Sequence, residues 1–165
     1  MMKVNVDAAM SKNRSIAACA AVARTESGDF LGASVIIMEG ALNPKVAEVL
    51  ACREGMALAS DIALHNFCLA SNCLTVIRNL QGAGMGRYGQ IIREIKTRTG
   101  AFTEVKFVYE SRRSNLDAHV LARSSILNSV GRHVPKNHVT NIEKVIELDL
   151  RRRDRVRKER KKGRR

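Results

Sequence analysis

The hydrophobic and polar positions of the first 40 residues alternate as they do in β-strands. "KVNVD" at positions 3–7 switches between polar and apolar side chains, which is the two-residue period of a strand with one buried face. Two apolar runs follow at 16–24 and 30–38, and "SGD" at 27–29 forms a turn between them. We therefore expect a three-stranded antiparallel meander, with Asp7 closing its first strand.

The later part of the chain alternates between helical and strand-like patterns. Asn43 and Pro44 supply an N-cap and a first-turn proline for a helix whose apolar face runs to Ile62. The elements expected after it are a strand at 67–71, helices at 73–80 and around 91–95, a strand at 105–109 and a helix at 115–130. Locally paired strands followed by alternating strands and helices predict an α/β fold, a mixed sheet with helices packed on it.

The positive charge is concentrated at the C-terminal end. The chain of 165 residues has a net charge of +13, and residues 151–165 hold 11 Lys/Arg against 2 Asp/Glu. Such a segment attracts polyanions, so we expect a nucleic-acid partner, with binding that weakens as salt rises. A nuclear import sequence and a solvated tail without a specific partner are the alternatives.

The cysteines and the hydropathy pattern restrict the class of protein. The four cysteines form no CxxC pair and have no histidine at ligand spacing, which argues against zinc. Three of the cysteines lie in apolar runs. We therefore expect buried, free thiols and a reducing compartment. Because no apolar stretch approaches 18 residues, we expect no membrane partner and a soluble monomer of the nucleus or cytoplasm.

Six ordered blocks of sequence carry a resemblance to a known family. They are "VNVDAA", "AEVLACREGMALA", "SNCLTVIRNL", "GRYGQIIREIK", "FTEVKFVYESRRSNLDAHVLAR" and "GRHV". Together they resemble the ribonuclease H-like domain of plant retroelement proteins, the reverse-transcriptase-associated type of the type 1 ribonuclease H superfamily. The resemblance implies a five-stranded mixed sheet flanked by helices, three antiparallel strands and then parallel strands. It assigns this domain to residues 1–134 and leaves 135–165 as a basic extension, partly helical or disordered.

The resemblance also implies a site. In catalytic members, four carboxylates hold two Mg²⁺ ions that cleave the RNA of an RNA/DNA hybrid. Asp7 and Glu48 match the first two positions and would be the catalytic, Mg²⁺-binding acids, whereas Asn72 and His119 stand at the other two. Each lost charge pair is worth roughly 4 kcal/mol at about 4 Å and an effective dielectric of ~20, so we expect Mg²⁺ binding and cleavage to be weak or absent. Asp117 lies about 200° around the helix from His119 and should not compensate.

Several of these residues also have ordinary structural explanations. Asn72 suits the cap of the helix at 73–80, and Asp7 suits a strand end where its carboxylate bonds to backbone. His119 fits a neighbour of the site better than a magnesium ligand, because imidazole prefers softer metals. A lone Glu48 on the small-residue side of its helix is costly to bury unless it is paired, which favours a position facing the site.

Two basic segments are candidates for contact with nucleic acid. In the family, the loop "ESRRSN" at 110–115 borders the substrate groove, which implies that Arg112, Arg113 and Asn115 contact the nucleic acid. Arg87 and Tyr88 follow a glycine-rich break and offer charge and stacking to a strand. A solvated loop and a helix entry are the respective alternatives.

The sequence therefore predicts a nucleic-acid-binding ribonuclease H-like domain of retroelement origin with a degraded two-metal site. One alternative is an active Mg²⁺-dependent endoribonuclease that cleaves the RNA of RNA/DNA hybrids. The other is a non-catalytic protein-interaction module.

Overall fold

Strands and helices follow one another in nearly the predicted order. The computed structural model describes residues 1–40, 43–82, 86, 88–134 and 139–163. The strands are β1 (Met2–Ser11), β2 (Ile16–Arg24), β3 (Phe30–Glu39), β4 (Asn66–Ser71), β5 (Glu104–Tyr109) and β6 (Gly131–His133). The helices are α1 (Pro44–Asp61), α2 (Leu74–Gln81), α3 (Gly89–Arg98), the 3₁₀ turn η1 (Thr99–Ala101), α4 (Leu116–Ser125) and α5 (Val139–Lys162). The predicted cap of α1 is confirmed, because the Asn43 side chain accepts a hydrogen bond from the Val46 N–H at 2.9 Å.

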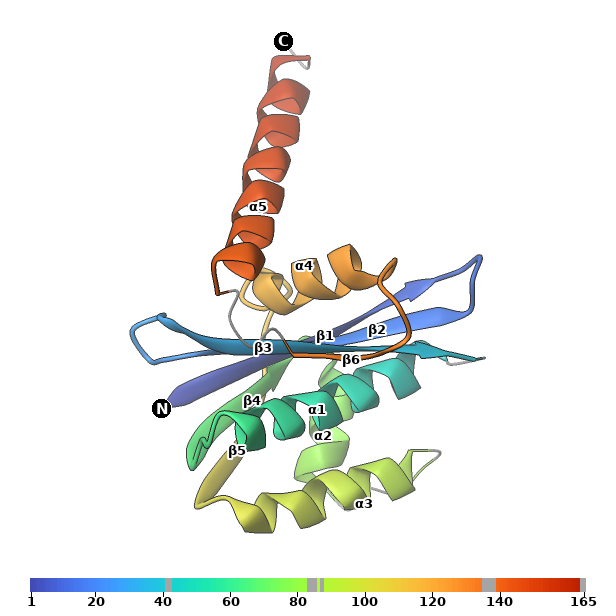
Figure 1. The fold of residues 1–165 in the computed structure, drawn as a ribbon, viewed down its shortest axis with the longest axis vertical. Coiled ribbons are helices and arrows are strands. Elements are labelled where there is room, and N and C mark those ends of the chain that lie inside the picture. Colours follow the sequence, from blue (N-terminus) through green and yellow to red (C-terminus); the bar gives the residue numbers. More distant parts are fainter. Residues whose placement is uncertain (41–42, 83–85, 87, 135–138, 164–165) are drawn as a thin grey trace.

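The strands form one mixed sheet in the order β5-β4-β1-β2-β3-β6 (Figure 1). β1, β2 and β3 are antiparallel, and β4 and β5 run parallel to β1, as predicted. β6, which the sequence pattern missed, adds a sixth strand beside β3. The prediction that Asp7 closes β1 is wrong, because the small apolar residues after it keep pairing with β2 as far as Ser11.

Two hydrophobic cores lie on the two faces of the sheet. α1, α2 and α3 cover one face and α4 covers the other (Figure 1). Alternate side chains of β1 and β2 enter each core: Val6 faces α1, and Val22 faces α4. At Gly55 of α1, a Cβ atom would lie 2.6 Å from Cγ1 of Val6, so glycine is what lets this helix approach β1 closely. This close approach packs α1 directly against β1.

The four cysteines are free thiols. Cys19 and Cys52 are buried, and the other two are partly buried. The Cys19 Sγ lies 3.3 Å from the carbonyl oxygen of Ala47, and burial together with the nearby Glu48 carboxylate raises the pKa of Cys19 to about 12. Such a thiol stays protonated and unreactive, so Cys19 serves as a core residue.

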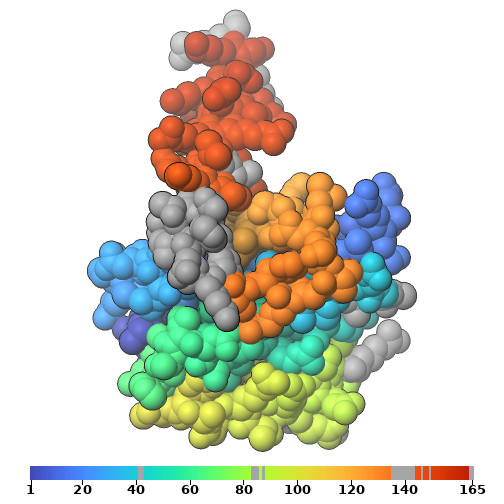
Figure 2. All heavy atoms as spheres, viewed as in Figure 1, coloured from blue at the N-terminus to red at the C-terminus, as the bar shows by residue number. Residues whose placement is uncertain are grey.

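Most of the basic extension forms a single helix. α5 spans Val139–Lys162 and extends away from the sheet beyond α4 (Figure 1), so that its C-terminal half projects from the body of the molecule (Figure 2). Residues 151–163 are all exposed. Among the described helices, none is both long enough and apolar enough to cross a lipid bilayer.

Candidate functional site

The candidate site lies at the point of β1 where its pairing with β4 ends. β1 pairs with β4 only as far as Val6 and Ser71, whereas its pairing with β2 continues. Beyond Val6 the β1 backbone is therefore open on the β4 side. Asp7 is the first residue of this open stretch, and its side chain points to the α4 face of the sheet because Val4 and Val6 point to the α1 face.

Asp7 forms a hydrogen bond with His119, and both side chains are largely buried. The Asp7 Oδ2 atom lies 2.7 Å from Nδ1 of His119, and the two side chains are 4% and 15% exposed. An ionised Asp7 accepts this hydrogen bond from the ring N–H, and the contact becomes an ion pair when the ring is doubly protonated. Burial raises the pKa of Asp7 above its ordinary value, and the contact with His119 partly offsets the effect.

Glu48 approaches the same opening from the second turn of α1. Burial, and then the charge and the hydrogen bond of Asp7, raise the pKa of Glu48 to about 8. The backbone N–H of Ala8 and the guanidinium of Arg112 lower the pKa of both Asp7 and Glu48, but by less than burial raises it. The Oε2 atom of Glu48 is buried without a hydrogen-bond partner among the described residues. The structure thus brings Asp7, Glu48 and His119 together, and near neutral pH the pair of acids carries less than its full charge.

The residues present do not fit a two-magnesium centre. Only Asp7 and Glu48 offer carboxylates, and Asp7 already has an imidazole on one oxygen. The described part of the chain contains no group of three His, Cys, Asp or Glu side chains that could hold a metal ion. Two hard dications need several charged oxygen ligands, which the amide of Asn72 and the imidazole of His119 do not provide.

Asn72 takes part in a buried amide network. Its Oδ1 atom accepts a hydrogen bond at 3.4 Å from Nδ2 of Asn115. The alternative that Asn72 caps the following helix is wrong, because α2 begins at Leu74 with Cys73 as its N-cap residue and no side-chain cap bond. The Asn72 side chain instead accepts its hydrogen bond from Asn115, which lies 43 residues further along the chain.

Asn115 is the centre of that network, which sequence reasoning missed. It donates to the carbonyl oxygen of Val6 at 2.7 Å and accepts from Asn5 Nδ2 at 2.8 Å, and its side chain is 1% exposed. Asn5 also donates to Glu110, whose other oxygen accepts from Lys3. The prediction that Asn115 contacts nucleic acid is therefore wrong: its amide is enclosed and ties the start of α4 to β1. The period of β1, which places Asn5 on the face of Asp7, was the available clue.

The predicted basic residues lie in different environments. Arg112 and Arg113 are exposed in the loop before α4, and the charge of Arg112 acts on both acids of the site. Tyr88 packs partly buried against the core on the α1 side, as the helix-entry alternative requires. Arg87 lies outside the described residues.

The neighbouring acid Asp117 does not join the site. It forms an ion pair at 2.6 Å with Arg24 of β2, as its angular position on the helix predicted.

The fold is that of ribonuclease H. The structure matches RNase H1 of the halophilic archaeon Halobacterium salinarum with a TM-score of 0.67 at 20% identity, over 78% of this chain and 98% of that one. It also matches LC11-RNase H1, described as a complex with an RNA/DNA hybrid, with a TM-score of 0.67 at 18% identity, over 76% and 96% of the two chains. A foamy viral protease-reverse transcriptase, described in the same way, matches with a TM-score of 0.62 at 16% identity, over 78% of this chain and 20% of that one.

The sequence itself identifies the family. Residues 5–125 match the model of the family described as reverse transcriptase-like. The chain therefore belongs to the reverse transcriptase-like family, and its fold is ribonuclease H-like. Among curated proteins, no relative matches the sequence.

Proposed function

We propose that this chain is a nucleic-acid-binding ribonuclease H-like domain of the plant retroelement type, which binds RNA/DNA hybrids and cleaves them weakly or not at all. The contact of His119 with Asp7 is the observation that carries the proposal. It places an imidazole on a carboxylate that a two-magnesium mechanism needs free, in a site that keeps only two acids. The six sequence blocks support the plant retroelement type.

Hybrid binding is assigned to the loop before α4. Arg112 and Arg113 are exposed there, and Arg112 lies close enough to Asp7 and Glu48 to affect their pKa values. In this proposal the two guanidinium groups hold phosphates of the hybrid beside the former catalytic acids, because arginine binds phosphate oxygens with charge-assisted hydrogen bonds. Two structural neighbours are described as complexes with an RNA/DNA hybrid, which supports this class of ligand.

The binding test uses the full chain and a labelled RNA/DNA hybrid. We expect salt-dependent binding that falls about tenfold in R112Q/R113Q, since two phosphate contacts of single-charge strength are removed. The matched control is R78Q/R93Q, which removes two exposed arginines from α2 and α3 on the opposite face of the sheet. Equal losses in the two variants would contradict the assignment to this loop. A full chain that binds no hybrid would favour the protein-interaction alternative.

The cleavage test uses the same hybrid in Mg²⁺ and in Mn²⁺. We expect no product from the natural chain. Cleavage that disappears in Asp7→Asn would overturn the proposal and establish a metal-dependent ribonuclease. The converse variant, N72D/H119D, restores both missing acids, and the appearance of metal-dependent cleavage in it would show that only the ligands had been lost.

A further inference from the structure

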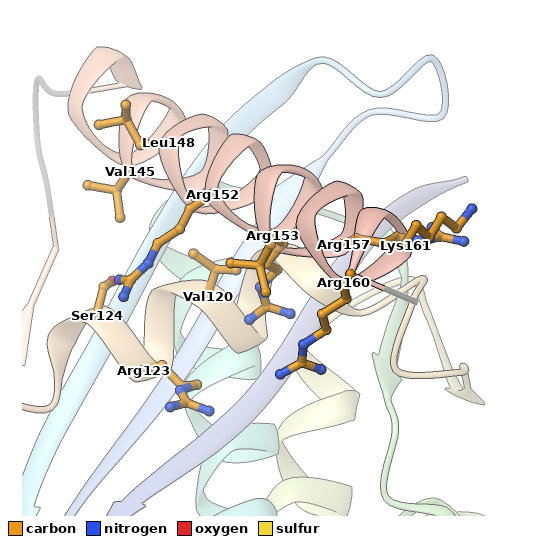
Figure 3. A pocket seen from close by; sticks show the side chains of 12 residues that line it. Val120, Arg123, Ser124, Val145, Leu148, Arg152, Arg153, Arg157, Arg160 and Lys161 are labelled. Atoms are coloured by element: carbon orange, nitrogen blue, oxygen red, sulfur yellow. The ribbon is translucent and has the colours of Figure 1, made fainter. Parts of the chain in front are cut away.

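α4 and α5 enclose a groove on the outer side of the α4 layer. The groove has a volume of about 1370 Å³. Val120, Arg123 and Ser124 line it from α4, and one face of α5 from Val145 to Gly163 lines the other side (Figure 3). We call this the α4–α5 groove. It is larger than the roughly 300–1,000 Å³ of small-molecule sites, and α5 is about 36 Å long, so its shape suits an extended ligand.

The charge of the groove has a single sign. Its basic lining residues are Arg123, Arg152, Arg153, Arg157, Arg160 and Lys161. No carboxylate is among the described residues that line it. Glu147 of α5 forms an ion pair with Arg151, and neither of these side chains lines the groove. The basic side chains that line the groove favour a polyanion as its partner.

The lining of the groove also includes apolar side chains. Val145 and Val156 of α5 are 39% and 41% exposed, and Leu148 is 64% exposed. Together with Val120 they form the apolar part of the lining. A duplex presents mainly phosphates to its surroundings and would leave these side chains uncovered. A single strand also offers unpaired base faces, which stack on apolar side chains and on arginine guanidinium planes.

We propose that the α4–α5 groove binds a single-stranded stretch of nucleic acid without sequence preference. The inference rests on the proposed function, because it gives the domain a second contact with the same class of ligand. Arg123 stands one helical turn after His119 on α4, so the groove starts next to the candidate hybrid site. A strand that leaves the hybrid would enter the groove with its phosphates toward the arginines and its bases against the apolar lining residues.

The test compares two faces of α5 in the full chain. R152Q/R157Q removes two charges from the groove, and R155Q/K158Q removes the same charge from residues that do not line it. With a labelled single-stranded RNA of mixed sequence, the loss of two phosphate contacts should weaken binding about tenfold near 0.15 M salt. It should also reduce the slope of log affinity against log salt by about 1.4, whereas the control should change neither quantity appreciably. Far-UV circular dichroism verifies that α5 remains helical in both variants.

A third variant tests the apolar lining residues. Leu148→Ser leaves the charge unchanged and alters a side chain that is already 64% exposed. It should weaken the binding of single-stranded RNA severalfold and leave the binding of a fully paired hybrid unchanged. Equal losses of single-strand and hybrid binding in Leu148→Ser would overturn the assignment to a single strand.

The remaining outcomes separate this inference from the proposed function. If R152Q/R157Q and R155Q/K158Q weakened the binding of single-stranded RNA equally, α5 would act as a non-specific basic tail, and the assignment of binding to the groove would be overturned. Binding of an acidic helical peptide, with no binding of single-stranded RNA, would overturn it in favour of a protein partner. In either case, hybrid binding that still depends on Arg112 and Arg113 would leave the proposed function standing.

Discussion

Removal of the His119 imidazole should leave a buried carboxylate without its partner. In His119→Ala, Asp7, whose side chain is 4% exposed in the natural chain, loses a hydrogen bond of 2.7 Å. Breaking a buried ion pair by deleting one partner costs about 3–5 kcal/mol. Because the His119 side chain is 15% exposed, water can reach the space it leaves, so we expect the lower end, about 3 kcal/mol at pH 7. For a chain of this size, this corresponds to a fall in Tm of roughly 6–12 °C.

The pH dependence of this loss identifies its cause. Burial raises the pKa of Asp7, and without His119 the pKa should rise further. An acid whose pKa is raised on folding contributes stability that is fully present below its unfolded pKa and is lost as the pH rises through its folded pKa. The destabilisation by His119→Ala should therefore shrink as the pH falls toward 4, where Asp7 becomes protonated and neutral.

Urea unfolding followed by far-UV circular dichroism provides the measurement, since the chain has no tryptophan. His65→Ala, at an exposed histidine, is the matched control and should change the free energy of unfolding by less than about 0.5 kcal/mol. In D7N/H119A the loss should be smaller than the sum of the two single losses, because neither partner is left charged and buried. A loss below about 1 kcal/mol at pH 7, or one that does not change with pH, would refute the reasoning.

Three further predictions concern the surroundings of this pair. Because the pKa of Glu48 is raised to about 8, the free energy of unfolding of the natural chain should fall between pH 4.5 and about 8, and Glu48→Gln should flatten this fall. Urea titrations at several pH values measure the free energy of unfolding, and the same pH profile in both proteins would contradict the prediction. Asn115→Ala should cost about 3 kcal/mol, since it removes the partner of the Val6 carbonyl and of one of the two Asn5 amide N–H groups in the interior. Exposed Asn128→Ala should cost almost nothing, and a similar loss in both variants would argue against the network. Millimolar Mg²⁺ should leave the Tm unchanged within about 1 °C, and a rise of several degrees, which selective binding to the folded state produces, would indicate a metal site.

The local patterns of the sequence predicted the sheet and missed its ends. The alternation in β1 and the small apolar residues of β2 are local properties, and they fixed the antiparallel meander. Ala8 to Met10 of β1 do not alternate, so nothing in them indicated that the strand continues past Asp7. β6 has only three residues and depends on its pairing with β3, which no periodic pattern reports.

The resemblance to the family, and not the local patterns, implied the grouping of Asp7, Glu48 and His119. The rotation of the helix around His119 excluded Asp117. The roles of Asn72 and Asn115 were not predictable, because each depends on a partner far along the chain. An asparagine before a helix is by itself a good cap, and only the approach of α4 to β1 gives its amide a different partner.

The electrostatic balance of the site connects its structure with its proposed loss of chemistry. A site with four acids repels itself and is stabilised when cations bind, so metal binding and folding favour each other. Here the imidazole of His119 supplies one internal partner, and the raised pKa of Glu48 removes most of a second charge near neutral pH. Asn72 carries no charge and bonds to a neutral amide. A dication would therefore have to displace the His119 contact and a proton to enter the site.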